Sequence, residues 1–411
     1  MNYANRWRTY DIILHKKIKY YTMIQKVIMG THVPAKLWLK DVEPSCLEQI
    51  INLASLPFAF KHVAIMPDAH AGLGMPIGGV LATKGVVIPN AVGVDIGCGM
   101  CALKTNLKAE NLDAKTLKSI LKEIRARVPL GFDHQSKPVD EAYLPDIDMS
   151  ELPFLKDKRK KCLVEIGTLG GGNHFIEIQK DTATGDVWIM IHSGSRHIGL
   201  QVAKYYNQIA EYWCEKWYAD TCKGLAFLPI ETQEAKDYMK EMDFCKHLAF
   251  QNRRAIMDSV KQSVQTVLPE AEFGDLINIA HNYAAFENHF GHDVIVHRKG
   301  ATRARTGEIG IIPGSMGTRS YIVEGLGNAD SFMSCSHGAG RKMSRTAAFN
   351  TLSLEEESRK MEEQGIVHGL RKSGLDEAPG AYKDISEVMA NENDLVKPLV
   401  ELAPLAVLKG D

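Results

Sequence analysis

Residues 92–100 read VGVDIGCGM, and this stretch holds the densest chemistry of the chain. A carboxylate, Asp95, and a thiol, Cys98, stand three residues apart between glycines. Glycine permits positive φ and close backbone approach, so both donor groups can face a common centre. On its own, such a segment is more often a glycine-rich turn around a buried cysteine. Cys98 and Cys101 also form C-x-x-C, a weak sign of zinc or redox chemistry, because no second C-x-x-C and no βαβ context accompany it.

Three histidines in other segments strengthen the case for a metal site. His174 stands at the start of a predicted strand, and His192 stands at the end of the next one. Because these strands form a predicted hairpin, the two imidazoles should lie side by side near its open end. His281 lies in a third, apolar stretch. One thiolate could bridge two metal ions, with Asp95 and the imidazoles completing each shell. Such ligands favour a transition metal over magnesium, and their softness alone suggests zinc.

Outward from this region, the predicted elements mix strands and helices. Apolar runs bounded by turn residues predict strands, and apolar residues at helical spacing predict helices. The predicted strands are 27–29, 63–66, 175–179, 187–191, 294–297, 308–312 and 320–323, and the predicted helices are 46–55, 115–128, 198–217, 231–267, 344–350 and 354–363. Strands and helices do not alternate regularly, so the expected fold class is α+β and not a doubly wound sheet.

The composition is that of an ordinary globular chain. Its 411 residues are 45% hydrophobic and 24% charged, with a formal net charge of −1. This excludes a globally basic nucleic-acid coat protein and an acidic disordered tail. The length suits one large domain or two smaller ones. Eight scattered cysteines predict a reducing compartment, no apolar run is typical of a membrane span, and the basic N-terminus lacks the apolar core of a secretory signal; we therefore expect a cytoplasmic protein.

The net charge conceals local differences. Residues 1–40 carry eight basic side chains against Asp11, a balance of +7, which leaves −8 for the remainder. From Arg298 to Arg345, eight Lys and Arg residues stand against three acids, a balance of +5. A run of charge is usually a solvated face. Because these basic residues interleave with glycine and serine, we instead expect a local phosphate-binding surface.

A second cluster of candidate residues reads SCSHGAGRKMSR, from Ser334 to Arg345. His337 precedes a loop of small residues that is predicted to open a basic helix, and the backbone N–H groups of such a loop attract phosphate. His337 could attack phosphorus as a nucleophile; the alternative is a surface histidine beside a helix cap. Another small-residue loop, 313–317, could face a base or ribose. The chain lacks the P-loop, H-E-x-x-H and G-x-S-x-G motifs and the K-x-D-G motif of lysine-nucleophile ligases.

Six motifs together resemble the RtcB family of RNA ligases. They are Asp95-Ile-Gly-Cys98-Gly-Met, Gly172-Asn-His-Phe-Ile-Glu177, His192-Ser-Gly-Ser-Arg196, His281-Asn282, Pro313-Gly-Ser-Met316 and His337-Gly-Ala-Gly340. The resemblance runs from about Val27 to Gly410 in the family's order. It implies one large catalytic domain over residues 27–411, with mixed sheets and flanking helices around a central dimetal cleft. A basic extension, residues 1–26, precedes this domain and could be disordered.

The resemblance also implies the residues of the site. Asp95, Cys98 and His174 would hold one manganese ion, and Cys98, His192 and His281 would hold a second, with Cys98 bridging. His337 would take GMP covalently from GTP. The implied guanylate contacts are Asn173, His174, Phe175, Ile176, Glu177, His281, Asn282, Pro313, Gly314, Ser315, Met316, Ser320, His337, Gly338, Ala339, Gly340, Tyr382 and Lys409.

The implied reaction joins an RNA that ends in a 2′,3′-cyclic phosphate or a 3′-phosphate to an RNA with a 5′-hydroxyl, in tRNA splicing or RNA repair. Guanylylated His337 and an RNA-(3′)pp(5′)G end would be the intermediates, with GTP as co-substrate and two Mn²⁺ ions as cofactors. Two alternatives stay open: a dinuclear metal phosphohydrolase acting on RNA ends, and a non-catalytic RNA-end sensor. The loop 67–76 carries hydrophobic residues where some relatives have a lysine and a polar residue, which leaves the preferred RNA end open. Any need for an activating protein stays open as well.

Overall fold

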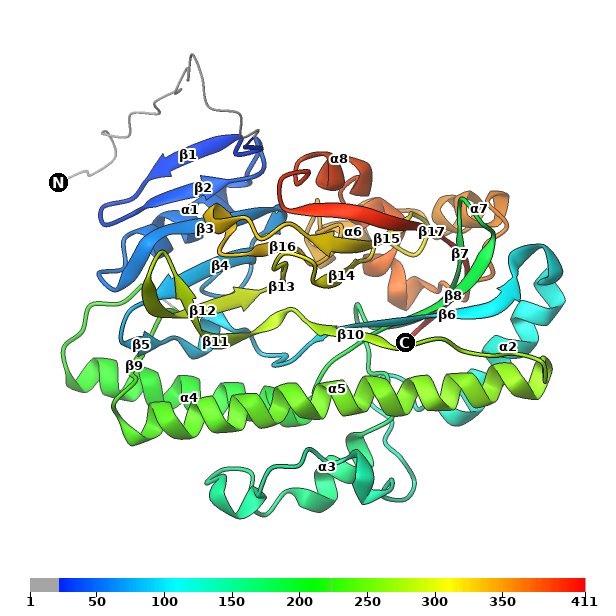
Figure 1. Ribbon diagram of the computed structural model, residues 1–411, viewed down its shortest axis with the longest axis horizontal. Coiled ribbons are helices and arrows are strands. Elements are labelled where there is room, and N and C mark those ends of the chain that lie inside the picture. The colour runs from blue at the N-terminus through cyan, green and yellow to red at the C-terminus, as the bar shows by residue number, and fades with distance from the viewer. Residues whose placement is uncertain (1–21, 223, 411) are drawn as a thin grey trace.

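The computed structural model describes residues 22–222 and 224–410, whose arrangement is shown in Figure 1. The helices are α1 (Pro44–Ala54), α2 (Ala114–Arg127), α3 (Arg159–Glu165), α4 (Arg196–Lys216), α5 (Gln233–Val267), α6 (Arg345–Thr351), α7 (Leu354–Glu363) and α8 (Ile385–Ala390). The strands are β1 (Lys26–Met29), β2 (Pro34–Leu37), β3 (Ala59–His70), β4 (Ile77–Thr83), β5 (Val86–Val87), β6 (Gly99–Lys108), β7 (Phe175–Asp181), β8 (Asp186–Ser193), β9 (Leu228–Pro229), β10 (Ile277–Ala280), β11 (Asn282–His289), β12 (His292–Lys299), β13 (Ala301–Arg303), β14 (Ile309–Ile312), β15 (Ser320–Gly325), β16 (Ser334–Ser336) and β17 (Val396–Lys409).

Two large sheets carry the fold. One has six strands in the order β1-β2-β3-β4-β12-β11, and the other has seven in the order β10-β6-β8-β7-β17-β15-β14. Strands β13 and β16 form a small separate pair, as do β5 and β9. Neighbouring strands are antiparallel in most pairs, whereas β2 and β3 are parallel. This mixture of sheets and helices confirms the predicted α+β class.

The long helices form a layer beside the sheets. Helices α4 and α5 lie together along one side of the molecule, as Figure 1 shows. Helix α5 begins at Gln233, two residues after the predicted start at 231, because the Thr232 hydroxyl accepts a hydrogen bond from the amide of Ala235 and caps the helix. Apolar residues of α2 and α5, such as Ile120 and Ile256, pack against Ile189 of β8. One face of the seven-stranded sheet is therefore covered by helices, and its other face carries a second buried apolar cluster that includes Met100, Phe175 and Met190.

The β7–β8 hairpin shows how this sheet presents side chains. Phe175 pairs directly with His192 in the antiparallel register, which confirms the predicted hairpin. Side chains alternate between the two faces of a strand. Ile176 and Ile178 therefore pack under the helices, whereas Phe175 and Glu177 face the opposite side.

The predicted elements are confirmed apart from the residues at which they begin and end. Three strands that adjoin Cys98 or His281 were not predicted. Strand β6 begins at Gly99, directly after Cys98, where the sequence indicates only a glycine-rich turn. Strands β10 and β11 flank His281. The helix predicted after the small-residue loop is confirmed as α6, which begins at Arg345, and His337 itself follows strand β16.

The predicted N-terminal extension, residues 1–26, lies mostly outside the described residues, which begin at Thr22. The end of that segment packs against the body: the amide of Met23 donates to Asp394 Oδ2 at 3.0 Å. Its separation from a catalytic domain of residues 27–411 stays a prediction. Within residues 22–222 and 224–410, no helix combines the length and apolar character needed to cross a membrane.

Candidate metal and nucleotide site

Two groups of metal-ligating side chains share one thiol. Asp95, Cys98 and His174 form one group, Cys98, His192 and His281 form the other, and within each group the ligand atoms lie within 4.8 Å of one another. The Cys98 sulfur lies 3.2 Å from His192 Nε2 and 3.5 Å from His174 Nε2. These are the five predicted ligands, in the two predicted groups.

The strand order of the seven-stranded sheet brings these five residues together. Strands β10, β6, β8 and β7 are consecutive neighbours, and each carries or adjoins a ligand at the same edge. Gly99, directly after Cys98, pairs with both Ala280 and Ser193. The amide of His281 also donates to the carbonyl of Cys98 at 2.8 Å. Ligands separated by up to about half the chain are thus fixed by main-chain pairing.

Hydrogen bonds behind the imidazoles fix which ring nitrogen faces the thiol. Nδ1 of His174 donates to the Leu169 carbonyl at 2.9 Å, and Nδ1 of His192 donates to the Asn173 carbonyl at 3.0 Å. Each Nε2 then presents its lone pair toward Cys98, as metal-ligating histidines do. Nδ1 of His281 is buried without a hydrogen-bond partner, which leaves a nitrogen free for an ion. This donor set fits a transition metal.

Helix α5 braces the metal groups with a buried guanidinium that the sequence analysis missed. Nη1 of Arg253 donates to the carbonyls of Gly97 and Ser193, each at 2.9 Å, and its Nε donates to Asn278 Oδ1 at 2.7 Å. These contacts lie beside Cys98, beside His192 and shortly before His281. The available signal was an Arg in a predicted helix with apolar residues at helical spacing on both sides, Ala249, Ile256 and Met257.

Cys101, the other half of the C-x-x-C pattern, does not belong to the metal groups. Its side chain is fully buried in the core between the sheet and the helices, and its thiol faces the Arg253 carbonyl at 3.8 Å.

A glycine makes room for Asp95, because a Cβ at Gly194 would lie 2.2 Å from Asp95 Oδ1. The absence of a side chain at Gly194 therefore leaves room for the carboxylate.

His337 lies next to the metal groups, with its ring centre 4.8 Å from that of His281. Its Nδ1 contacts Asp68 Oδ2 at 2.6 Å, and its amide donates to the same oxygen at 3.1 Å. Burial raises the pKa of Asp68, but the neighbouring His337 and Lys383 outweigh this and hold the pKa below its usual value. An ionised Asp68 keeps the proton on Nδ1, so Nε2 is the nitrogen available to a ligand.

Asp68 is a second residue that sequence reasoning missed. It was quoted only as part of the loop 67–76, whereas the structure places it in strand β3, fully buried. Gly340 makes the approach possible, because it has a φ of +71° and a Cβ there would lie 2.0 Å from the Asp68 carbonyl oxygen. The His337-Gly-Ala-Gly340 motif thus wraps around the end of β3.

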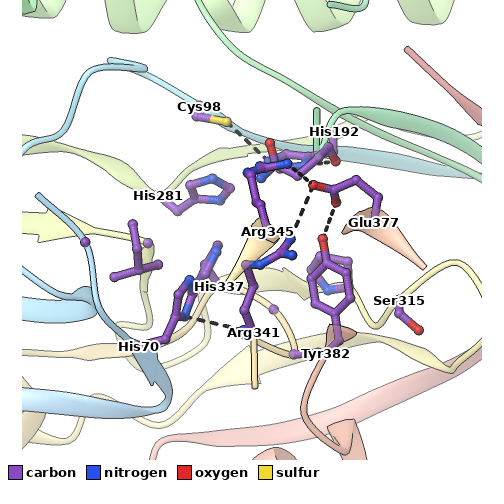
Figure 2. Close-up of a pocket in the computed structure, with 18 of the residues that line it drawn as sticks. His70, Cys98, His192, His281, Ser315, His337, Arg341, Arg345, Glu377 and Tyr382 are labelled. Carbon is purple, nitrogen blue, oxygen red and sulfur yellow. Dashed lines mark hydrogen bonds and ion pairs between the residues drawn. The ribbon is translucent and has the colours of Figure 1, made fainter. Parts of the chain in front are cut away.

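A cavity of about 540 Å³ joins His337 to the metal groups, and Figure 2 shows part of its wall. Most of the implied guanylate contacts line it: Asn173, Phe175, Glu177, His281, Asn282, Pro313, Gly314, Ser315, Met316, His337, Gly338, Ala339, Gly340, Tyr382 and Lys409. His174, Ile176 and Ser320 are not on its wall. The Ile176 side chain packs under the helices, and the Ser320 hydroxyl accepts hydrogen bonds from Gln179 Nε2 and the Gly314 amide, both at 3.1 Å.

The expected phosphate surface from Arg298 to Arg345 is corrected. Arg298 is fully buried and bonds Glu287 at 2.5 Å, and Lys299 donates to the carbonyls of Leu73 and Asn90. Arg319 pairs with Glu401, a residue outside the counted segment. Of the eight basic residues, all in the described part of the chain, Arg341 and Arg345 line the cavity.

A second cavity, of about 800 Å³, adjoins the first. The two share Asp95, Glu377 and Lys409 on their walls. The second is also lined by aromatic and basic side chains: Phe132, Phe349, His134, Lys161, Arg196 and His197. The junction of the two cavities therefore lies at Asp95, a carboxylate of the first candidate metal group.

Comparison with known proteins gives consistent matches along nearly the whole chain. The family model described as "tRNA-splicing ligase RtcB" matches residues 49–152 and 146–410. "RNA-splicing ligase RtcB" of Escherichia coli K12 is 41% identical over 94% of this chain and 100% of its own length. "tRNA-splicing ligase RtcB" of Nanoarchaeum equitans is 34% identical over 97% of this chain and 100% of its own length. The Pyrobaculum aerophilum protein of the same name is 32% identical over 94% of this chain and 95% of its own.

Proposed function

Because this chain belongs to the RtcB family of ligases and is an RNA ligase, we propose that it joins RNA 2′,3′-cyclic phosphate or 3′-phosphate ends to 5′-hydroxyl ends with GTP and manganese. The contact between His337 and Asp68 is the observation that most strongly supports this proposal. A hydrolase using the metal groups alone has no need for a nucleophilic imidazole held in one tautomer. Metal dependence itself is supported by the family and by the two ligand groups.

The proposed first steps prepare the RNA end and load the histidine. Water opens the cyclic phosphate by breaking the P–O2′ bond, and this leaves a 3′-phosphate and a 2′-hydroxyl. His337 Nε2 then attacks the α-phosphorus of GTP, a P–N bond forms, and pyrophosphate leaves with the electron pair of the broken P–O bond. Asp68 stabilises the positive charge that develops on the ring through its contact with Nδ1.

The proposed last steps transfer GMP and then release it. An oxygen of the RNA 3′-phosphate attacks the guanylyl phosphorus and breaks the P–N bond, which gives the RNA-(3′)pp(5′)G end and restores His337. The 5′-hydroxyl attacks the RNA phosphorus of that end, loses its proton, and displaces GMP. Asp95, Cys98, His174, His192 and His281 would hold two metal ions, which when bound neutralise phosphate charge and align the displaced groups.

The two cavities supply places for the two kinds of substrate. The first, with His337 on its wall, is proposed to hold the guanylate. The second is proposed to hold an RNA strand, because Phe132 and Phe349 can stack on bases while Lys161 and Arg196 face phosphates. Cytoplasmic localisation stays a prediction, supported by the eight free cysteines.

Labelling with α-³²P-GTP and Mn²⁺ tests the nucleophile. The wild-type chain should retain acid-labile, alkali-stable GMP, and H337N should retain none, because asparagine can keep the hydrogen bond to Asp68 but has no second ring nitrogen. H247A, at an exposed histidine of α5, is the matched control and should label normally. Label on H337N would refute the assignment. Metal-dependent loss of the RNA 3′-phosphate without any labelled protein would favour the phosphohydrolase, and binding of RNA ends with no turnover would favour the sensor.

A further inference from the structure

One buried carboxylate, Glu377, contacts four side chains of the cavity wall. Its Oε1 lies 2.6 Å from Arg345 Nη1 and 3.4 Å from Arg341 Nη1. Its Oε2 lies 3.4 Å from Lys409 Nζ and accepts a hydrogen bond from the Tyr382 hydroxyl. Figure 2 shows Glu377 among three of these partners, Arg341, Arg345 and Tyr382. The Glu377 side chain is only 3% exposed, whereas its partner Arg345 is 50% exposed.

The four partners come from separate parts of the fold. Arg345 begins helix α6, Arg341 lies in the loop before it, Tyr382 follows a short 3-10 turn, and Lys409 ends strand β17. Arg341 and Arg345 also bond the carbonyl and the carboxylate of Asp376, respectively. Glu377 is the anchor that all four side chains have in common.

The charge of this cluster is fixed by the contacts. Burial raises the pKa of Glu377, but Lys409 and the two arginines outweigh it and hold the pKa below its usual value. Burial and the Glu377 carboxylate raise the pKa of Tyr382 well above its usual value, so the phenol stays protonated. Three cations and a hydroxyl donor therefore surround two carboxylates, Asp376 and Glu377, and Glu377 is the one that contacts all four.

Glu377 also stands where the two cavities meet. It lines both of them, as do Lys409 and Asp95, whereas Arg341, Arg345 and Tyr382 line the first. Under the proposed function, the phosphate of an RNA end must meet the guanylate at this junction. Long Arg and Lys side chains without a common anchor would sample many rotamers there and would lose that freedom when a phosphate binds.

We propose that Glu377 is a positioning residue for the phosphate of the incoming RNA end: it holds three cations and one phenol ready to receive that anion, and it cancels one of their positive charges. The assignment rests on the proposed function. Preorganised donors accelerate a reaction because no reorganisation is needed at the moment of transfer. Cancelling one charge also limits how tightly any RNA, productive or not, is attracted.

Two substitutions at position 377 separate the effect of the carboxylate charge from the effect of side-chain length. E377Q removes the charge and keeps the size, whereas E377D keeps the charge and shortens the side chain. E401Q removes a carboxylate from the exposed pair with Arg319 and is the matched control. For each protein we would measure binding of an RNA with a 3′-phosphate without GTP over a range of salt, labelling with GTP, and kcat and KM for ligation.

E377Q should steepen the salt dependence of RNA binding by about one counterion, because one more cation is left uncompensated. Its kcat for ligation should fall by about 10–100-fold, since the phosphate is no longer held in one orientation. E377D should keep the wild-type salt dependence and still lose kcat, and E401Q should match the wild type in both. An E377Q protein with unchanged salt dependence and unchanged kcat would overturn the proposal.

Two further outcomes are informative. If E377Q does not fold, E377D decides: a wild-type salt dependence with reduced kcat supports the proposal, and an unchanged kcat overturns it. If the wild type forms no guanylylated protein, the proposed function fails, yet the salt dependence of RNA binding still tests the charge role of Glu377. The two failures are therefore distinguishable.

Discussion

The two walls of the cavity are built by different interactions. On the metal wall, which carries Cys98, His192 and His281, main-chain hydrogen bonds and one buried guanidinium hold the segments that carry the ligands. On the cationic wall, which carries Arg341 and Arg345, a shared carboxylate fixes the side chains. Main-chain hydrogen bonds hold a geometry that varies little with salt or pH. Side chains held by ion pairs can instead shift toward a competing anion. The metal wall is thus suited to hold an ion permanently, and the cationic wall is suited to exchange its partner.

Two buried glutamates of the same cavity show why one carboxyl group stays charged and another does not. Both Glu177 and Glu377 are almost fully buried. Burial raises the pKa of Glu177 to about 8, because Gln179 and Lys409 compensate only in part. The pKa of Glu377 is lowered instead, because Lys409 and two arginines lie against it. Burial without sufficient partners neutralises a carboxyl group, and burial among cations keeps it charged.

The largest expected effect is on the metal wall. C98A should remove metal from both ligand groups, because each group uses this thiol. C101A, at the buried thiol outside the groups, should keep the full metal content. Elemental analysis of the purified proteins checks this result. Two metal ions per chain in C98A would refute the bridging role.

An intermediate effect, on metal affinity, is expected when Arg253 behind the metal wall is replaced. R253M removes the guanidinium that touches the segments of three ligands, and metal affinity should fall by about 10–100-fold. The neighbouring Arg254 is exposed, so R254M is the matched control and should bind metal normally. Titration of the metal-free proteins measures both affinities. A loss of stability in R253M with normal metal affinity would show that Arg253 serves only the core.

The smallest expected effect compares the two glutamates through pH. The pKa of Glu177 in the folded chain is about 8, against an ordinary value of 4.5, so the unfolded state releases this proton first as the pH rises. Wild-type stability should therefore fall across pH 4.5 to 8 more than that of E177Q, by about 1–3 kcal/mol.

The lowered pKa of Glu377 gives the opposite sign. Its stabilising contribution should be present above the ordinary pKa and lost on acidification, so E377D should keep it and E377Q should not. Denaturant unfolding of the four proteins at several pH values measures both trends. Parallel pH profiles for E177Q and E377Q would contradict the contrast between the two glutamates.

The sequence was sufficient for residues that carry their chemistry in short motifs at strand ends. Cys98, His174, His192, His281 and His337 all fall into this class, and the structure brings them together as expected. The hairpin register was also predictable, because apolar runs and a polar turn define it.

Residues that act through long-range contacts could not be read from the sequence. Asp68 and His337 are 269 positions apart, and only the packing of β3 against the His337 loop brings them into contact. Arg298 contributes to the +5 balance from which a phosphate surface was expected, because its partner, Glu287, lies outside the segment whose charges were counted. Ile176 was predicted as a guanylate contact because it lies within a motif of the site. The alternation of side chains along a β-strand instead turns it into the core.

Ligation of an RNA with a 2′,3′-cyclic phosphate to an RNA with a 5′-hydroxyl, in the presence of GTP and Mn²⁺, tests the central claim most directly. The wild-type chain should form the joined RNA and release one GMP per junction, and omission of GTP or the H337N substitution should abolish joining. Joined RNA without GTP, or from H337N at the wild-type rate, would contradict the account.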